Sequence, residues 1–193
     1  MINIELKVSV KDFKETIRHL KKIGASSTGK FSQVDTYYKS RNRRLKIREI
    51  DHKIYQLITY YRKDQAESKI SDYTIKKLDK KELKRYKWHL SRTNGKSIKV
   101  CKKRELWLYK NTRIHLDKVQ ELGRFIELET VVKDPSDLQQ LEKEHQEIIN
   151  LLNLSAFTKI GRSYSDLLLE KEDLRKKIVL PLIKHTKPIL GAS

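Results

Sequence analysis

The segment RIHLDKVQELGRFIELE, residues 113–129, places the strictest limit on what this chain can fold into. Polar and aliphatic side chains alternate in both halves of the segment, and a strand repeats every two residues, so the pattern predicts two strands joined by a turn. One face is aliphatic and suits a core. The other face carries an arginine, a histidine and three carboxylates: Arg113, His115, Asp117, Glu127 and Glu129. Carboxylates that share a face need a cation among them, either a metal ion or Lys and Arg from other strands.

The charge of the whole chain points to an anionic partner. The 44 Lys and Arg residues outnumber the 25 Asp and Glu residues, which gives a net charge of +19. Nucleic acid, a nucleotide, polyphosphate or an acidic surface would each fit, while exposed helical lysines account for part of the excess. Cys101 is the only cysteine, which excludes an internal disulfide framework and a cysteine zinc site.

The chain shows no run of about 20 apolar residues of the kind that spans a bilayer. It begins directly with an alternating strand, so we expect no signal peptide. These two features predict a soluble, cytoplasmic protein without a membrane partner.

Alternation recurs along the chain and predicts an antiparallel α+β protein. Strands are expected at 2–10, 33–39, 44–50, 54–62, 73–78, 97–109 and in the segment 113–129. Helical spacing predicts helices at 11–23, at 79–91 with Asp79 and Glu82 as a capping box, and from Pro135 to about Leu152. Residues 25–32 and 63–72 are expected to be polar loops, 154–161 a connector and 162–170 a short element that begins like a strand. The alternation of 54–62 does not decide which of its faces points inward.

The polar strand faces carry two complementary sets of charges. The acidic set is Glu5, Asp117, Glu127 and Glu129, and the basic set is Lys7, Lys46, Arg48, Lys102, Arg104 and Arg113. In a sheet that curls with these faces inward, carboxylates would lie opposite cations around a wet lumen. Carboxylate oxygens suit Mg²⁺ or Mn²⁺, and Lys and Arg suit phosphate oxygens, so the pattern predicts a site for a metal–triphosphate. If the faces were instead a solvated exterior, acids and bases would not gather on the same side.

Seven segments occur along the chain in a specific order: IELK (4–7), QVDTYY (33–38), LKIRE (45–49), ITYYR (58–62), KVCKKRELWLY (99–109), the segment 113–129 and RSYSDLLLE (162–170). In this ordered set the chain resembles the CYTH family, the triphosphate tunnel metalloenzymes that include class IV adenylate cyclases and thiamine triphosphatases. The resemblance implies an eight-stranded antiparallel β-barrel with flanking helices, dependence on a divalent metal and a triphosphate substrate. It implies a tunnel domain over residues 1–170, followed by a basic C-terminal tail over 171–193.

Site residues follow from the same resemblance. The metal ligands it implies are Glu5, Asp117, Glu127 and Glu129, and the catalytic residues are Glu5, Lys7, Glu127 and Glu129. The phosphate-binding residues it implies are Lys7, Lys46, Arg48, Lys102, Arg104 and Arg113. Asn3 replaces the first glutamate of the family's Glu-x-Glu-x-Lys pattern, and Tyr61 stands where a lysine is expected, so Arg62 or Lys69 is expected to supply that charge. For His115 we expect a hydrogen bond to a carboxylate rather than a role as ligand or base.

Two functions remain open from the sequence. The first is a CYTH-type enzyme that acts on a nucleoside triphosphate or inorganic triphosphate with Mg²⁺ or Mn²⁺, either by hydrolysis of a phosphoanhydride or by class IV cyclase-type cyclisation. Asn3 favours hydrolysis. The second is a non-catalytic binding module for polyphosphate, a nucleotide or a triphosphorylated RNA end, for which the basic helix at 79–91 speaks. A homodimer is one oligomeric state that the sequence leaves open.

Overall fold

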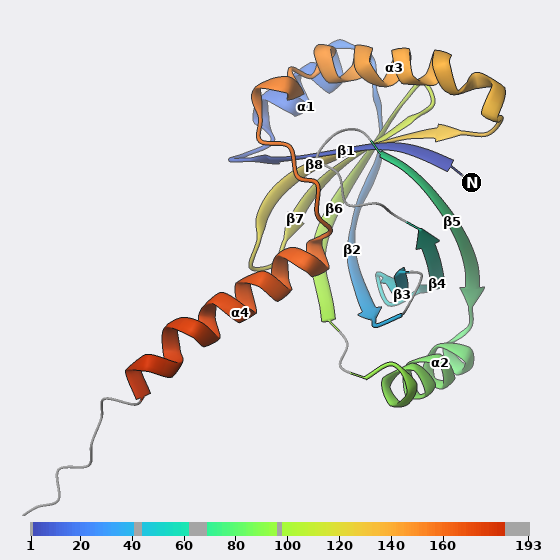
Figure 1. Cartoon of the computed structure of the whole chain (residues 1–193). Coiled ribbons are helices and arrows are strands. Elements are labelled where there is room, and N and C mark those ends of the chain that lie inside the picture. Colours follow the sequence, from blue (N-terminus) through green and yellow to red (C-terminus); the bar gives the residue numbers. More distant parts are fainter. Residues whose placement is uncertain (1, 41–43, 62–68, 96–97, 184–193) are drawn as a thin grey trace, which may run out of the picture.

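The computed structural model describes residues 2–40, 44–61, 69–95 and 98–183. Within these residues the chain forms eight strands and four α-helices (Figure 1). The strands are β1 (Ile2–Val10), β2 (Ser26–Tyr38), β3 (Arg44–Ile50), β4 (Ile54–Tyr61), β5 (Lys69–Leu78), β6 (Ile98–Tyr109), β7 (Thr112–Val119) and β8 (Gly123–Val132). The helices are α1 (Lys14–Lys22), α2 (Lys80–Thr93), α3 (Leu138–Leu151) and α4 (Tyr164–Ile183), with short 3-10 turns at Pro135–Asp137 and Leu154–Ala156.

All strand pairs are antiparallel, and they close into a barrel in the order β1-β5-β4-β3-β2-β6-β7-β8. Strand β1 completes the closure because it pairs with β5 on one side and with β8 on the other. The predicted hairpin at 113–129 is β7 and β8, in which His115 lies opposite Glu127. The prediction of an eight-stranded antiparallel barrel with flanking helices is therefore confirmed.

The main apolar core lies outside the barrel wall, between the strands and the helices. The aliphatic faces of β1, β7 and β8 pack against α1 and α3, with Leu20 and Ile148 fully buried. Figure 1 shows these two helices together over one side of the barrel. Helix α2 covers a second part of the wall through Leu83 and Leu90, which pack with Tyr55 of β4. Because the helices bury the aliphatic faces, the charged faces of the same strands turn into the lumen.

Several expected helix features are confirmed. The Asp79 side chain accepts a hydrogen bond from the Glu82 amide, and the Glu82 carboxylate accepts one from the Asp79 amide, which completes the capping box of α2. Gly24 has a φ of 75° directly after α1, as a helix stop requires. In α3, the buried side includes His145 and Ile148 as predicted.

Two predicted loops are wrong in part. Residues 26–32 belong to β2, which pairs with β6 from Ser26 to Tyr37 with a register shift between Ser27 and Gly29. This half of β2 is largely exposed, so its small polar residues carry no hydrophobic period. Residues 69–72 belong to β5 and pair with β1, whereas 63–68 lie outside the described residues.

The segment 162–170, expected to begin like a strand, is instead the start of α4. The Ser163 hydroxyl accepts a hydrogen bond from the Asp166 amide, and the Asp166 carboxylate accepts one from the Ser163 amide. This is a capping box, which favours a helix start over a strand. Residues 171–183 of the expected tail continue the same helix, which extends away from the barrel in Figure 1. Residues 184–193 lie outside the described residues.

Candidate active site in the barrel lumen

The lumen holds a cavity of about 400 Å³. Described side chains from each of the strands β1 to β8 line it. Its lining includes the predicted residues Glu5, Lys7, Lys46, Arg48, Lys102, Arg104, Arg113, Glu127 and Glu129. The strand β4, whose faces the sequence left unassigned, turns Gln56 and Ile58 inward, while Tyr55 and Leu57 pack toward α2. A volume of this size accommodates a triphosphate and part of a larger substrate.

Asp35 organises the cations on β3. Its carboxylate accepts hydrogen bonds from Arg48 Nε at 2.9 Å, Arg48 Nη2 at 3.2 Å and Lys46 Nζ at 3.0 Å. It accepts a fourth from Nε2 of Gln33, two residues earlier on β2. Burial alone would raise the pKa of Asp35, but Arg48 and Lys46 hold it far below its ordinary value. Burial and the charge of Arg48 lower the pKa of Lys46 to about 8.

Asp117 organises the cations on β6 in the same way. Arg104 donates to both of its oxygens at 2.6 Å, and Lys102 Nζ donates at 3.0 Å. The Tyr164 hydroxyl donates to Asp117 Oδ2 at 3.1 Å. Burial opposes ionisation of Asp117, yet Arg104 and Lys102 keep its pKa below the usual range. Asp117 was predicted to be a metal ligand. In the structure it is fully buried, and its carboxylate contacts Lys102 and Arg104.

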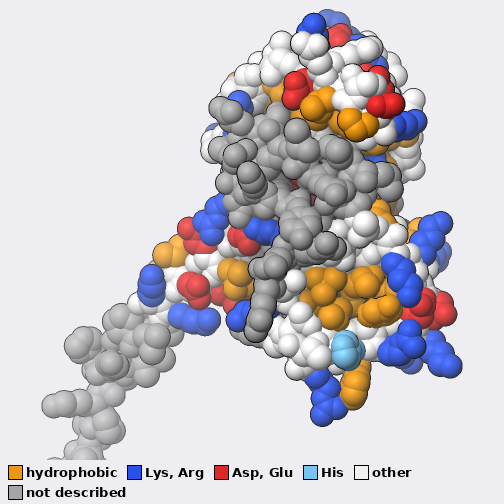
Figure 2. Space-filling model, turned by 45° about the vertical axis from the view of Figure 1, so that its right-hand side comes forward, with side chains coloured by type: hydrophobic (Ala, Val, Ile, Leu, Met, Phe, Trp, Pro, Cys, Tyr) orange, Lys and Arg blue, Asp and Glu red, His pale blue; other side chains and the backbone are white. Residues whose placement is uncertain are grey.

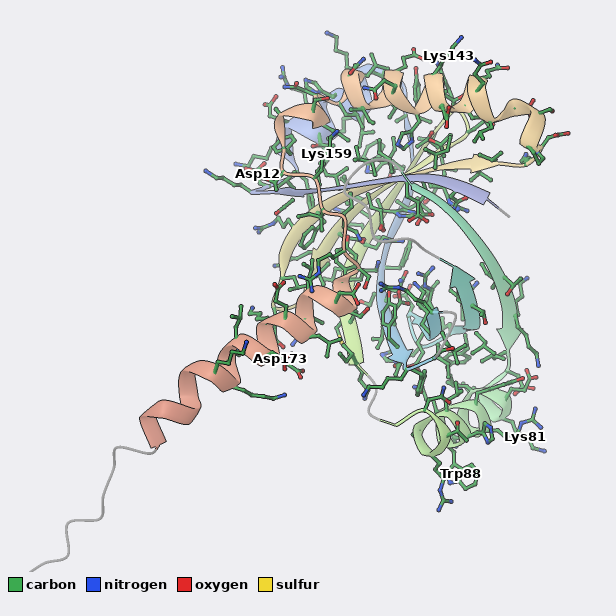
Figure 3. The ribbon with its side chains drawn as sticks, viewed as in Figure 1. Asp12, Lys81, Trp88, Lys143, Lys159 and Asp173 are labelled. Carbon is green, nitrogen blue, oxygen red and sulfur yellow. The ribbon has the colours of Figure 1, made fainter. Side chains whose placement is uncertain are left out.

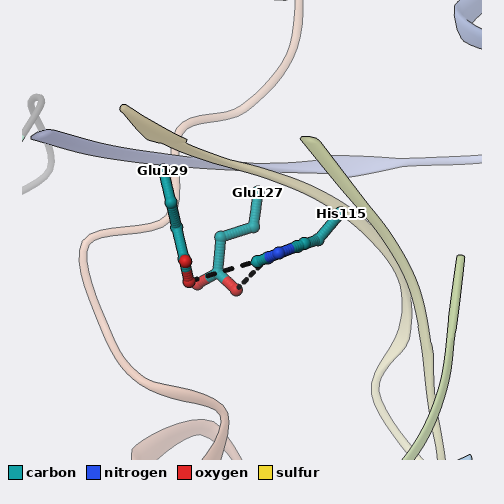
Figure 4. Close-up of side chains that lie close together, drawn as sticks. All are labelled: His115, Glu127 and Glu129. Carbon is teal, nitrogen blue, oxygen red and sulfur yellow. Dashed lines mark ion pairs between the residues drawn. The ribbon is translucent and has the colours of Figure 1, made fainter. Parts of the chain in front are cut away.

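Three side chains on β7 and β8 form a group with the spacing of a metal site (Figure 4). One potential ligand atom from each of His115, Glu127 and Glu129 lies within 4.8 Å of the others. His115 Nδ1 is 3.8 Å from Glu127 Oε2 and 3.6 Å from Glu129 Oε1, which is too long for hydrogen bonds. Nδ1 therefore lies beside both carboxylates without a hydrogen bond of normal length, and the imidazole points into the group.

This group suits a divalent cation. His115 Nδ1 is buried and has no hydrogen-bond partner among the described residues, a costly state that a bound ion would relieve. Burial and the charge of Arg104 lower the pKa of His115, which keeps the imidazole neutral and able to coordinate. Burial opposes ionisation of Glu127, but Lys7 and other cations hold its pKa well below the ordinary value.

The remaining predicted residues surround this group. Lys7 Nζ lies 3.4 Å from Glu127 Oε1, and Arg113 Nη2 lies 3.1 Å from Glu129 Oε2. Glu5 lines the cavity from β1 and pairs in register with Glu129, although it lies outside the group of three. Asn3 also faces the cavity from β1. Arg62 lies outside the described residues, and of Lys69 the structure describes the backbone alone.

Sequence reasoning missed two residues of the site. Asp35 lies in the segment QVDTYY, where its alternation with Gln33 and Tyr37 was the available signal. Tyr164 enters the lumen from the first turn of α4, and its ring lies 4.3 Å from Lys7 Nζ and 5.0 Å from Lys102 Nζ. The capping box at Ser163 and Asp166 would have placed a helix start here, and hence Tyr164 in the first turn of a helix.

Comparison with known proteins agrees with this architecture. The model of the CYTH domain matches residues 1–164. A "Putative adenylate cyclase" of Methanocaldococcus jannaschii is 26% identical over 175 residues, which cover 86% of this chain and 98% of that protein.

Solved structures share the fold. One from Pyrococcus horikoshii OT3 is 20% identical, covers 86% of this chain and 98% of its own, and has a TM-score of 0.70. A "putative adenylyl cyclase" from Hippeastrum with a dominant triphosphatase activity is 11% identical, covers 89% of this chain and 95% of its own, and has a TM-score of 0.59. Identities this low show the fold alone. Among the described residues no helix is long and apolar enough to cross a membrane.

Proposed function

Because this chain belongs to the CYTH family, we propose that it is a divalent-metal-dependent enzyme that hydrolyses a phosphoanhydride bond of a triphosphate substrate. The single observation that carries the proposal is that one cavity is lined both by a group of possible metal ligands and by anchored cations. The group is His115, Glu127 and Glu129, and the four cations that Asp35 and Asp117 hold in place are Lys46, Arg48, Lys102 and Arg104.

The cations would bind the triphosphate oxygens. Buried guanidinium groups match phosphate oxygens in pairs, and both arginines are fixed in orientation by two-point contact with a carboxylate. Since Asp35 and Asp117 already balance part of the charge, the lumen can keep its cations close together without substrate. A substrate would therefore meet a site that needs little rearrangement, which is the condition for electrostatic catalysis.

The acidic group would hold the metal. His115, Glu127 and Glu129 would supply the ligands, with Glu5 beside them on β1. A bound Mg²⁺ or Mn²⁺ would neutralise phosphate charge and make a water more acidic. Lys7 and Arg104 keep Glu127 ionised and aimed into the group, and Arg113 does the same for Glu129. Asp117, which the sequence placed among the ligands, acts in this proposal as the anchor of Arg104 and Lys102.

The choice of hydrolysis rests on β1. Asn3 occupies the lumen position at which the family pattern has a glutamate, so one carboxylate is missing from this strand. Cyclisation requires a second task, activation of a ribose 3′ hydroxyl against the α phosphorus while pyrophosphate leaves. The likeness to a relative named as an adenylate cyclase makes cyclisation the second candidate.

The test is product analysis. The protein is incubated with ATP or inorganic triphosphate and Mn²⁺ or Mg²⁺, and the products are separated by ion-exchange chromatography. We expect orthophosphate and the shortened substrate as products. If ATP instead yields cyclic nucleotide and pyrophosphate, the reaction is cyclisation and not hydrolysis. Glu127→Gln should abolish turnover, and Glu142→Gln, an exposed change on α3, should not. Triphosphate binding without any product, with both metals and both substrates, would make the protein a binding module and overturn the proposal.

A further inference from the structure

Helix α2 carries a second cationic region, on the face that points away from the barrel. Its residues Lys81, Lys84, Arg85, Trp88 and Arg92 are all exposed. At 3.6 residues per turn they fall within a sector of about 100° on one side of the helix. Leu83 and Leu90 occupy the opposite side and pack against the barrel. Figure 3 shows Lys81 and Trp88 projecting from α2 into solvent. We call these five residues the α2 basic face.

The charges of the α2 basic face are not balanced locally. Among the described residues, none of its four cations has an ion-pair partner, although the structure has many such pairs elsewhere. The one acidic residue of the helix, Glu82, is already engaged by Lys76 and by the helix cap. Like charges at neighbouring helical positions repel, so this arrangement costs stability unless an anion binds.

Trp88 makes the face more than a charged surface. Its side chain is 60% exposed, although tryptophan is the side chain with the largest apolar area to bury. The Arg92 guanidinium lies over the ring, 4.8 Å from its centroid, so one face of the indole already carries a cation while most of the side chain stays open to solvent. In Figure 2 the lowest part of the body, where α2 lies, shows Lys and Arg side chains around hydrophobic ones.

We propose that the α2 basic face binds single-stranded nucleic acid, with Trp88 as a stacking platform for a base and the four cations as contacts for the phosphates. Charge complementarity identifies the partner as a polyanion, and the exposed ring identifies one that also presents flat aromatic groups. A chain of nucleotides offers both at a spacing that a helix face can follow. Duplex nucleic acid hides its base faces in the stack, and an anionic lipid surface has none.

This site is independent of the tunnel. The cations of the lumen are buried or half-buried and paired with carboxylates, whereas those of the α2 basic face are exposed on the outer side of the helix. An RNA with a 5′ hydroxyl carries no triphosphate for the lumen. Binding of such an RNA therefore does not require a triphosphate in the tunnel, and charge reversals on and off α2 show which surface binds it.

The experiment measures fluorescence anisotropy of a labelled 20-nucleotide RNA of uridines with a 5′ hydroxyl, titrated with the full chain. With four phosphates neutralised, the slope of log affinity against log salt should be about −3, or about 50-fold weaker binding at 200 mM than at 50 mM salt. Lys84→Glu with Arg85→Glu should weaken binding at 50 mM salt at least tenfold and reduce the slope by about 1.4. The control with the same change in net charge is Lys14→Glu with Lys143→Glu, exposed positions on α1 and α3, and it should bind nearly as the unchanged chain does.

Stacking has its own signature. Trp88→Ala should weaken RNA binding about tenfold and leave the salt slope unchanged, because no phosphate contact is lost. Trp88 and Trp107 are the chain's two tryptophans, and Trp107 is buried, so RNA should quench the emission that Trp88→Phe removes. Equal weakening by both charge-reversal pairs would overturn the proposal in favour of diffuse attraction. It would also be overturned by tighter binding to duplex RNA, by competition from inorganic triphosphate, or by binding to phosphatidylserine vesicles without binding to the RNA.

Discussion

The protein has two cationic regions that are built in opposite ways. In the lumen, Arg104 is buried and Arg48 is half-buried, and each is fixed by a carboxylate, Asp117 or Asp35. On the α2 basic face, the cations are exposed and have no such partner among the described residues. Buried, paired cations hold a fixed geometry at the cost of desolvation, whereas exposed cations attract any polyanion and are screened by salt. The comparison indicates that the lumen suits an anion of defined shape, such as a triphosphate. The α2 basic face suits a flexible polyanion that also presents flat aromatic groups.

The largest expected effect comes from removing the counter-charge of the lumen. Asp117→Asn leaves Arg104 and Lys102 buried beside a neutral amide, and breaking a buried pair in this way costs about 3–5 kcal/mol. The free energy of unfolding, measured by urea titration, should fall by that amount. The matched change on the other region, Lys84→Met, removes an exposed charge and should alter stability by less than about 0.5 kcal/mol. Equal losses from the two variants would mean that the two regions do not differ in the way proposed.

The next effect concerns the acidic side of the lumen. His115→Ala removes one of the three side chains that we propose as metal ligands and leaves the Lys and Arg ion pairs of Glu127 and Glu129 in place, so it tests metal binding apart from substrate binding. Isothermal titration should show Mn²⁺ affinity weaker by about 10- to 100-fold, the range seen when a metal site loses a supporting group. His89→Ala, an exposed histidine of α2, is the control and should leave Mn²⁺ affinity unchanged. Unchanged affinity in His115→Ala would remove this residue from the site.

The charged wall of the lumen could be predicted from the sequence because one period governs it. Alternation in β3 and β6 is enough to place Lys46 and Arg48, and Lys102 and Arg104, on shared faces. A face of a strand is fixed by counting in twos, so in β3 the cations followed once Leu45 and Ile47 were assigned to the core. In β6 the period alone was not enough, because Lys102 and Arg104 share their face with Val100 and Leu106. The sequence did not show which of these charged residues pair with one another. The pairing of Asp117 with Arg104 depends on the register between β6 and β7.

The residues that the sequence did not predict lie where the period is weak or changes. Asp35 shares its strand with Val34, Thr36 and Tyr38, whose β-forming side chains mark the opposite face more strongly. Tyr164 was misplaced because the segment 162–170 alternates briefly, although Ser163 and Asp166 have the spacing of a capping box. The basic character of α2 is visible in the sequence, but the position of Trp88 among its cations needs the helical angle of each residue.

A third prediction separates the two regions by pH. The pKa of Lys46 is lowered to about 8, so its charge is lost as the pH rises through that value. A bound triphosphate would favour the charged form, and affinity for inorganic triphosphate should fall about tenfold between pH 7 and pH 9, when about a tenth of Lys46 remains protonated. Lys46→Arg keeps its charge over this range and should flatten the profile. A profile that is equally steep in Lys46→Arg would assign the effect to another group.

The smallest expected effect compares Tyr164 in the lumen with Trp88 on α2, two aromatic rings that lie against cations. Tyr164→Phe keeps the ring near Lys7 and Lys102 but removes the hydroxyl that donates to Asp117, a hydrogen bond to a charged group worth about 1.5–3 kcal/mol at most. Because Arg104 still holds Asp117 at both oxygens, we expect only about a fivefold rise in KM for triphosphate, about 1 kcal/mol, with kcat nearly unchanged. Trp88→Phe should change neither constant, since its ring faces solvent on α2. A fall in kcat without a change in KM would place Tyr164 at the reacting atoms, and the two rings would then differ in kind and not only in burial.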